Sequence, residues 1–373
     1  MINILLADDD VKEIIIKKNN IQSDISDGAV RNVDVNLSIQ IVYNNQQNHT
    51  KSITLSEYMD YWLYEVKKRK LKPTSFDRLE NTVKYQVIAE LGNKIINDVT
   101  TEDVQYLIDV LKEKKYSYST IKKSYEALRA CLNYAVSKQV ISRNPAEYIE
   151  FLKKEIEDEL SDDVRFFSDN EIMMLKNEAL SVNDKGEYIY RLGNVFVLLL
   201  TTGIRVGETL ALRWSDVNLE NKIMRVNKRL SIVKNRDNGV SENSKKYTLI
   251  EQNPKTKNSD RVVPLSDAAI TALKELYKIT GHYELVVANK KGGYVLHKNL
   301  DRTFKSILEH TGIRKTGIHT LRHTFASKLF RNGVEIKTIS EILGHADVSI
   351  TYNIYVHIIQ EQKMRAVSVI DTV

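Results

Sequence analysis

A charged segment without an apolar stripe divides this chain into blocks that must fold separately. The segment KKEIEDELSDD, Lys153–Asp163, is mostly charged, with two lysines followed by acids and few apolar residues. It therefore offers no continuous face for a core. At 373 residues the chain suits two or three compact domains. We expect a linker at 153–164 between a first folded block and a second that spans 165–373.

The block before this linker carries helix signals. Thr54 and Glu57 form a capping box ahead of apolar residues at helical spacing. Further helices are predicted at Thr74–Ile88, at Thr101–Lys112 after the N-cap Thr100, and at Ser119–Lys138. The last helix places five residues in one stripe: Ile121, Tyr125, Leu128, Leu132 and Ala135. The sequence predicts a helical domain over 53–152.

Residues 1–52 give the weakest signal. They combine an acidic start with the Asn/Gln-rich text NNQQN, Asn44–Asn48, and predict a single strand at Ser38–Tyr43. We assign no role to this segment.

The block after the linker mixes helices and strands. Ser168 and Glu171 form another capping box, an almost wholly apolar helix covers Val195–Leu200, and a glycine turn at Gly203 precedes a short helix from Arg205. Helices resume at Ser266. Strands are predicted at Ile223–Val226, Leu230–Val233, Tyr247–Ile250 and Arg261–Leu265. The expected fold class is mainly α with a small antiparallel β-sheet.

Composition excludes several classes of protein. No apolar run is long enough to span a bilayer, and the start MINILLADDDVKE lacks the basic residues and longer apolar core of a secretory signal. We expect a cytoplasmic protein that does not act in a membrane. The single cysteine, Cys131, allows no intramolecular disulfide or cysteine-based zinc cluster and is expected to be a buried small hydrophobe. The net charge of +6 is compatible with nucleic acid but does not establish it.

The segment HTLRHTFAS, His319–Ser327, concentrates cationic groups on one helical face, because His319, Arg322 and His323 stand at i, i+3 and i+4. A metal, a phosphate or neighbouring protein groups could occupy that face. Thr320 stands where zinc hydrolases carry a glutamate base, and Arg322 would repel a cation, so we expect no metal. Guanidinium and imidazole suit a phosphate.

Other residues add to such a phosphate site. Arg205 follows the glycine turn with Glu208 one helical turn later, either as a brace or as a surface ion pair of little energetic value. Lys255 lies in PKTK and His345 in LGH. The chain has no Walker loop, no carboxylates clustered as a magnesium site and no Ser-His-Asp pattern, which leaves tyrosine as the nucleophile. A phenol with a pKa near 10 attacks only where cations or a base assist it.

Together, Arg205, Lys255, HTLRH, LGH and Tyr355 resemble the signature of the tyrosine recombinases, the phage-integrase family. The likeness covers roughly residues 53–360. TTGIRVGE, PKTKNSDRVVPL and LGHADVSITYNIYVH are most similar to integrases of Gram-positive conjugative transposons and phages.

The resemblance implies site-specific recombination of double-stranded DNA without metal or nucleotide cofactors. Tyr355 would attack the scissile phosphate, forming a 3′-phosphotyrosyl bond and releasing a 5′-hydroxyl. Arg205 and Arg322 would bind the non-bridging phosphate oxygens, and Glu208 would orient Arg205. Lys255 would protonate the leaving oxygen, and His319 would accept the tyrosine proton. His345 would donate a hydrogen bond to the phosphate.

Some assignments have competitors. Lys257 competes with Lys255, whose Lys-Thr pair matches the family better. Tyr352 competes with Tyr355, which precedes a Val-His pair as the family's nucleophile does. His323 is expected to serve packing. A type IB topoisomerase and a non-catalytic DNA-binding regulator are the competing functions.

The helical domain resembles the family's core-binding domain, which forms a clamp around the duplex with the catalytic domain. Phosphate contacts are expected from residues at helix starts, with solvated side chains as the alternative. The candidates are Lys72, Thr74, Ser119, Lys122 and Lys123.

The resemblance also implies features outside the catalytic set. A β-insertion at 234–253 is expected to touch DNA or a neighbouring subunit, and a C-terminal tail at 356–373 to dock on a neighbouring protomer or fold back on its own. Residues 1–52 lack the basic aromatic pattern of an arm-binding domain. We expect the protein to be a homotetramer on DNA and a monomer when free. We also expect an accessory protein to assist excision.

Overall fold

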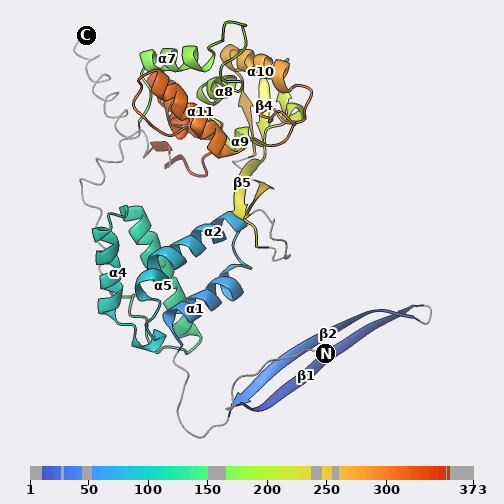
Figure 1. Ribbon diagram of the computed structural model, residues 1–373, viewed down its shortest axis with the longest axis vertical. Helices are drawn as coiled ribbons and strands as arrows, with labels where there is room; N and C mark the ends of the chain where they lie inside the picture. The colour runs from blue at the N-terminus through green and yellow to red at the C-terminus, as the bar shows by residue number, and fades with distance from the viewer. Residues whose placement is uncertain are drawn as a thin grey trace.

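The computed structural model describes residues 11–26, 29–43, 53–149, 165–236, 246–253, 260–349 and 351–352. They form mostly helices with small antiparallel sheets, which confirms the predicted fold class. One group of helices contains α1, α2, α4 and α5, and another contains α7, α8, α10 and α11, with β5 running between the two groups (Figure 1). The predicted linker at 153–164 lies outside the described residues.

The first helical group follows the caps and stripes of its sequence. Its elements are α1 (Leu55–Tyr61), η1 (Trp62–Lys67), α2 (Pro73–Thr82), η2 (Val83–Val87), α3 (Ile88–Leu91), η3 (Ile96–Asp98), α4 (Thr101–Glu113) and α5 (Tyr118–Ser137).

The predicted capping box of Thr54 and Glu57 starts α1, and Thr100 caps α4. The helix predicted from Ser119 begins one residue earlier, because the Ser117 side chain accepts the Thr120 N–H. All five residues of the predicted stripe in α5 are buried.

Cys131 is fully buried in this core, as expected. Burial raises the pKa of its thiol to about 12. The thiol is therefore protonated at neutral pH and behaves as a small apolar side chain.

An antiparallel hairpin of β1 (Val11–Ser26) and β2 (Ala29–Tyr43) forms the N-terminal part. The single predicted strand at Ser38–Tyr43 covers only the end of β2, so the sequence underestimated the strand content here. The pairing register shifts at three places along the hairpin. Each shift interrupts the two-residue alternation by which a strand is recognised in sequence.

The second group contains helices and two separate sheets rather than the one sheet expected. The sheets are β3–β4–β7 and β5–β6, both antiparallel. The elements are α7 (Asp169–Ala179), α8 (Asn194–Thr202), α9 (Val206–Thr209), η4 (Trp214–Asp216), β3 (Val217–Asn218), β4 (Ile223–Val226), β5 (Arg229–Lys234), β6 (Tyr247–Gln252), β7 (Arg261–Pro264), α10 (Asp267–Thr280), α11 (His297–His310), α12 (His319–Arg331) and α13 (Ile336–Leu343).

Helix α8 is the centre of this group. Its residues Val195–Leu200 are buried on every side, and α10 and α12 pack against it. A helix that is apolar all round must be enclosed by others. This enclosure gives the residues at the C-terminal end of α8 a rigid support.

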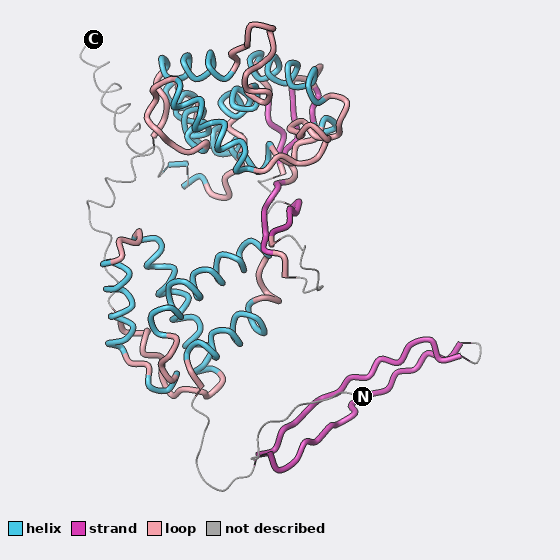
Figure 2. The backbone as a smooth tube through the Cα atoms, in the orientation of Figure 1, coloured by secondary structure: helices cyan, strands magenta, loops and turns pink. Residues whose placement is uncertain are grey.

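Strands β5 and β6 project from the second group toward α2 (Figure 2). Their pairing runs from Arg229 opposite Gln252 to Lys234 opposite Tyr247. Part of the predicted insertion at 234–253 thus forms this hairpin, and residues 237–245 lie outside the described part. None of the helices that the structure describes is long and apolar enough to cross a membrane.

Candidate active site

The turn after α8 positions Arg205 against α12. Gly203 ends α8 in the left-handed conformation, with φ +64°. A Cβ there would lie 2.3 Å from the Phe325 ring of α12, so only glycine fits without displacing that helix. Arg205 follows as the N-cap residue of α9.

Arg322 joins this turn to the end of α13. Its side chain is only 3% exposed. Its Nη1 donates to the Gly203 carbonyl at 2.7 Å and its Nη2 to the Leu343 carbonyl at 2.8 Å. Arg205 Nη1 donates to the same Leu343 carbonyl at 3.3 Å. One carbonyl therefore holds both guanidinium groups side by side.

Glu208 supplies negative charge beneath these arginines. Its carboxylate accepts from the Arg205 backbone N–H and from Arg205 Nη1, each at 2.9 Å. Glu208 is 7% exposed, so the contact is not a surface ion pair. Although burial by itself raises the pKa of Glu208, Arg261 and Arg205 together lower it, and the carboxylate stays ionised.

Arg261 is a member of the site that the sequence analysis missed. Its Nη2 donates to Glu208 at 2.9 Å and its Nε to the Ile342 carbonyl at 2.7 Å. A Cβ on Gly344 (φ +67°) would lie 2.8 Å from Arg261 Nη1, which explains the glycine of LGH. An arginine opening the apolar strand RVVP is the one sequence signal that could have identified it.

The histidines of the site are neutral at pH 7. His319 and His323 stack edge to face, with ring centroids 4.9 Å apart. Partial desolvation of the ring, and then the charges of Arg322 and Arg205, lower the pKa of His319 to about 4. His319 still reaches solvent, so a neutral imidazole is accessible to take up a proton.

His345 lies deeper in the same site. It is 9% exposed, and its Nδ1 is 2.7 Å from the Thr351 hydroxyl. Burial, followed by the charges of Arg322, Arg205 and Arg261, lowers its pKa to about 3. A neutral ring with one nitrogen directed at Thr351 is held in a fixed orientation.

The structure thus brings together five of the predicted residues. These are Arg205, Glu208, His319, Arg322 and His345. Lys255, its competitor Lys257, and Tyr355 lie outside the described residues. Tyr352 is described and 44% exposed.

The predicted DNA contacts lie at helix starts. Lys72 is exposed at the N-cap of α2, and Thr74 is half-buried in its first turn. Ser119, Lys122 and Lys123 begin α5, where Lys123 Nζ donates to Ser119 at 3.0 Å.

The arrangement of arginines and histidines around Glu208 suits an anionic ligand that carries one or two negative charges on several oxygens. Two preorganised guanidinium groups and two neutral imidazoles surround one spot, with Glu208 and Arg261 behind them. Among the described residues no three His, Cys, Asp or Glu side chains gather as a metal site. The chemistry within reach is electrostatic stabilisation of a phosphoryl group.

Comparison with known families yields two matches on this chain. Residues 167–362 match the model described as the phage integrase family, and residues 54–112 match the phage integrase N-terminal SAM-like domain.

Individual relatives agree. A tyrosine recombinase XerC-like protein of Caldanaerobacter subterraneus subsp. tengcongensis is 34% identical, over 86% of this chain and 83% of its own. The integrase of Staphylococcus phage L54a is 25% identical, over 85% of this chain and 92% of its own length. The Tn1549 transposon integrase, solved with a circular intermediate DNA, shares the fold with a TM-score of 0.64 at 20% identity, covering 82% of this chain and 95% of that one.

Proposed function

The chain belongs to the phage integrase family of tyrosine recombinases, and on that premise we propose that it is a site-specific DNA recombinase that integrates and excises a mobile element. The observation that carries the proposal is the pair of guanidinium groups, Arg205 and Arg322, bound to one carbonyl beside neutral histidines. Glu208 offsets part of the repulsion between the two cations, and a phosphate bound between their donors would offset more of it.

In the proposed reaction a tyrosine oxygen attacks the scissile phosphorus and the bond from phosphorus to the 5′-oxygen breaks. Arg205 and Arg322 bind the non-bridging oxygens, whose charge grows in the transition state. His319 accepts the tyrosine proton, and Lys255 gives a proton to the departing 5′-oxygen. Attack of a 5′-hydroxyl from another strand reverses these steps and rejoins the DNA.

The low pKa values of the histidines fit these roles. His319 must be neutral to accept a proton, and burial with Arg322 and Arg205 keeps it so at pH 7. His345 donates to phosphate, and its contact with Thr351 orients the ring for this purpose. Glu208 keeps Arg205 in place, and Arg261 keeps Glu208 in place.

Tyr355 is the proposed nucleophile and Lys255 the proposed acid. The Tyr355-Val-His text matches the family pattern, whereas Tyr352, one helical turn earlier, does not. Double-stranded DNA is the proposed substrate in a bacterial cytoplasm, with four protomers acting together and an accessory protein assisting excision. Lys72, Thr74, Ser119, Lys122 and Lys123 are proposed to contact the DNA backbone.

The test is trapping of the covalent adduct. The protein is incubated in EDTA with nicked duplexes tiled across the DNA that flanks its gene, and the products are separated on a denaturing gel. The nick lets the short 5′-hydroxyl fragment leave, so the adduct accumulates. We expect a protein–DNA band that Tyr355→Phe abolishes and the matched control Tyr352→Phe retains.

Each result has a distinct meaning. A band that persists in Tyr355→Phe and disappears in Tyr352→Phe reassigns the nucleophile. If the wild-type protein forms no adduct on a duplex that it binds tightly and specifically, it is a DNA-binding regulator rather than a recombinase.

A further inference from the structure

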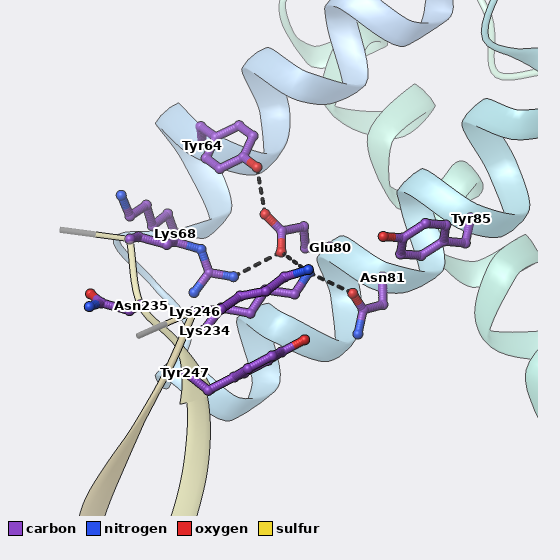
Figure 3. A pocket seen from close by; sticks show the side chains of 10 residues that line it. Tyr64, Lys68, Glu80, Asn81, Tyr85, Lys234, Asn235, Lys246 and Tyr247 are labelled. Atoms are coloured by element: carbon purple, nitrogen blue, oxygen red, sulfur yellow. Dashed lines mark hydrogen bonds and ion pairs between the residues drawn. The ribbon is translucent and has the colours of Figure 1, made fainter. Parts of the chain in front are cut away.

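The two helical groups are connected in two ways. One connection is the peptide chain at 150–164. The other is a contact of Lys234 and Arg236, at the C-terminal end of β5 and just after it, with helix α2, beside a cavity of about 730 Å³ (Figure 3). Together the two connections join the same two bodies at two places.

The hairpin contact is built from charged groups. Lys234 Nζ lies 2.7 Å from Glu80 and 2.7 Å from the Asn81 side-chain oxygen, and the Lys234 backbone N–H donates to Asp77 at 2.9 Å. Arg236 Nη2 lies 2.5 Å from Asp77 and 2.9 Å from Glu80. Two cations of one domain therefore meet two carboxylates of the other.

Glu80 is the centre of this contact and is 4% exposed. Tyr64 donates to it from the helical side at 2.5 Å. Burial alone raises the pKa of Glu80, but hydrogen bonds from Lys234, Tyr64 and Arg236 outweigh it and lower the pKa to about 2. The Arg236 guanidinium also lies over the Phe76 ring, 4.7 Å from its centroid.

The base of the hairpin is held firmly on the catalytic side. Glu251 of β6 accepts from Arg213 at 2.6 Å and from the Tyr294 hydroxyl at 2.5 Å. Arg229 of β5 donates to Gln252 of β6 at 2.6 Å, which ties the two strands to each other. Because β6 is fixed at its base and β5 is tied to it, the hairpin transmits the position of the catalytic group to α2.

We propose that Lys234 and Arg236, with Asp77 and Glu80, form a latch that closes a ring around the DNA duplex and opens to admit it. The proposal rests on the proposed function and on the expected clamp, in which the duplex lies between the helical and catalytic domains. A duplex without a free end enters a closed ring only when the ring opens. The peptide chain cannot open, whereas ion pairs separate and are rehydrated.

The phosphates of incoming DNA also favour opening of the latch. Lys234 and Arg236 can exchange their carboxylate partners for phosphates, while Asp77 and Glu80 are repelled by them. The latch is thus released by the ligand that it must admit.

The test is a crosslink across the latch in the full-length protein. Asn81→Cys and Lys234→Cys place two thiols where the side chains now share a hydrogen bond, and a short bis-maleimide joins them. The buried Cys131 does not compete. The matched control is Glu90→Cys with Lys114→Cys, a contacting pair within the helical domain alone.

Protein crosslinked before addition of closed-circular plasmid should bind it much more weakly than uncrosslinked protein. Protein crosslinked on the plasmid should remain bound in 1 M salt, where phosphate contacts are screened, and should leave once a restriction enzyme linearises the plasmid. The control crosslink should change neither result.

Three outcomes contradict the latch. The first is a thiol pair that does not crosslink, because the hairpin then does not contact α2 in solution. The second is crosslinked protein that loads onto closed circles as well as uncrosslinked protein, and the third is equal release from circular and linear plasmid. Failure of the uncrosslinked protein to bind any DNA contradicts the proposed function itself, which separates the two hypotheses.

Discussion

Replacing Glu208 with Gln removes the negative charge that Arg205 and Arg261 share. The amide keeps the size of the side chain and can still accept a hydrogen bond, but it leaves two cations without their common carboxylate. Arg261 is 9% exposed, so water cannot replace the lost charge. The effect on stability should therefore far exceed that of an exposed ion pair.

The size of the stability loss in Glu208→Gln follows from the burial of the charges that the substitution leaves unpaired. Removing one partner of a buried ion pair costs about 3–5 kcal/mol, because the other charge remains buried. Arg205 is 36% exposed along its side chain and can be partly rehydrated, which places the expected loss near the lower end, at about 3 kcal/mol. The Arg205 guanidinium should also lose its fixed position, so the rate of adduct formation should fall.

Urea unfolding measured by tryptophan fluorescence tests this value. The chain has two tryptophans, so a Trp62→Phe background leaves Trp214 as the reporter of the catalytic domain. The matched control is Asp260→Asn, which breaks the exposed pair with Arg225 and should cost about 0–1 kcal/mol. Equal losses in the two variants would refute the view that Glu208 neutralises buried charge.

The same measurement has a pH dependence of known sign. Because the folded pKa of Glu208 is lowered from its ordinary value of 4.5, its stabilisation is complete above that value and is lost as the pH falls through the lower folded pKa. The difference in the free energy of unfolding between wild type and Glu208→Gln should therefore become smaller as the pH falls below 4.5.

Three further predictions follow from the same geometry. Gly344→Ala should destabilise the catalytic domain by at least about 1–2 kcal/mol, because residue 344 has a positive φ. The added methyl group should also displace Arg261 and slow adduct formation. A variant that matches wild type in the unfolding and trapping assays would contradict the close approach of Gly344 to Arg261. The pKa of His345 is lowered to about 3, so between about pH 3 and 6.5 this histidine is protonated in the unfolded chain and neutral in the folded one. The urea midpoint should therefore fall as the pH drops below 6.5. His345→Asn should make this fall shallower. The pKa of the buried Cys131 thiol is about 12, so a thiol reagent at pH 8 should react only in step with unfolding, and rapid labelling of native protein would exclude its place in the core.

Much of the local structure was predictable because its causes lie within a few residues. The capping boxes at Thr54 and Ser168 and the stripe from Ile121 are patterns of short spacing, and each formed the predicted element. The β1–β2 hairpin was mostly missed because its register shifts break the alternation on which strand prediction depends.

The sequence by itself determined which chemistry the chain carries, through the arginine, histidine and tyrosine motifs and the caps that start their helices. Only the tertiary structure decided how these groups share their supports. Arg322 binds a carbonyl 119 residues away, and Arg205 one 138 residues away. The sequence marks Arg261 only as a charged residue that opens an apolar strand, and its contact with Glu208 appears only in the folded chain. The contact of Lys234 with Glu80, 154 residues apart, has no signal in the sequence. Caps and stripes arise from the backbone geometry of a single element, whereas these contacts exist only once separate elements pack together.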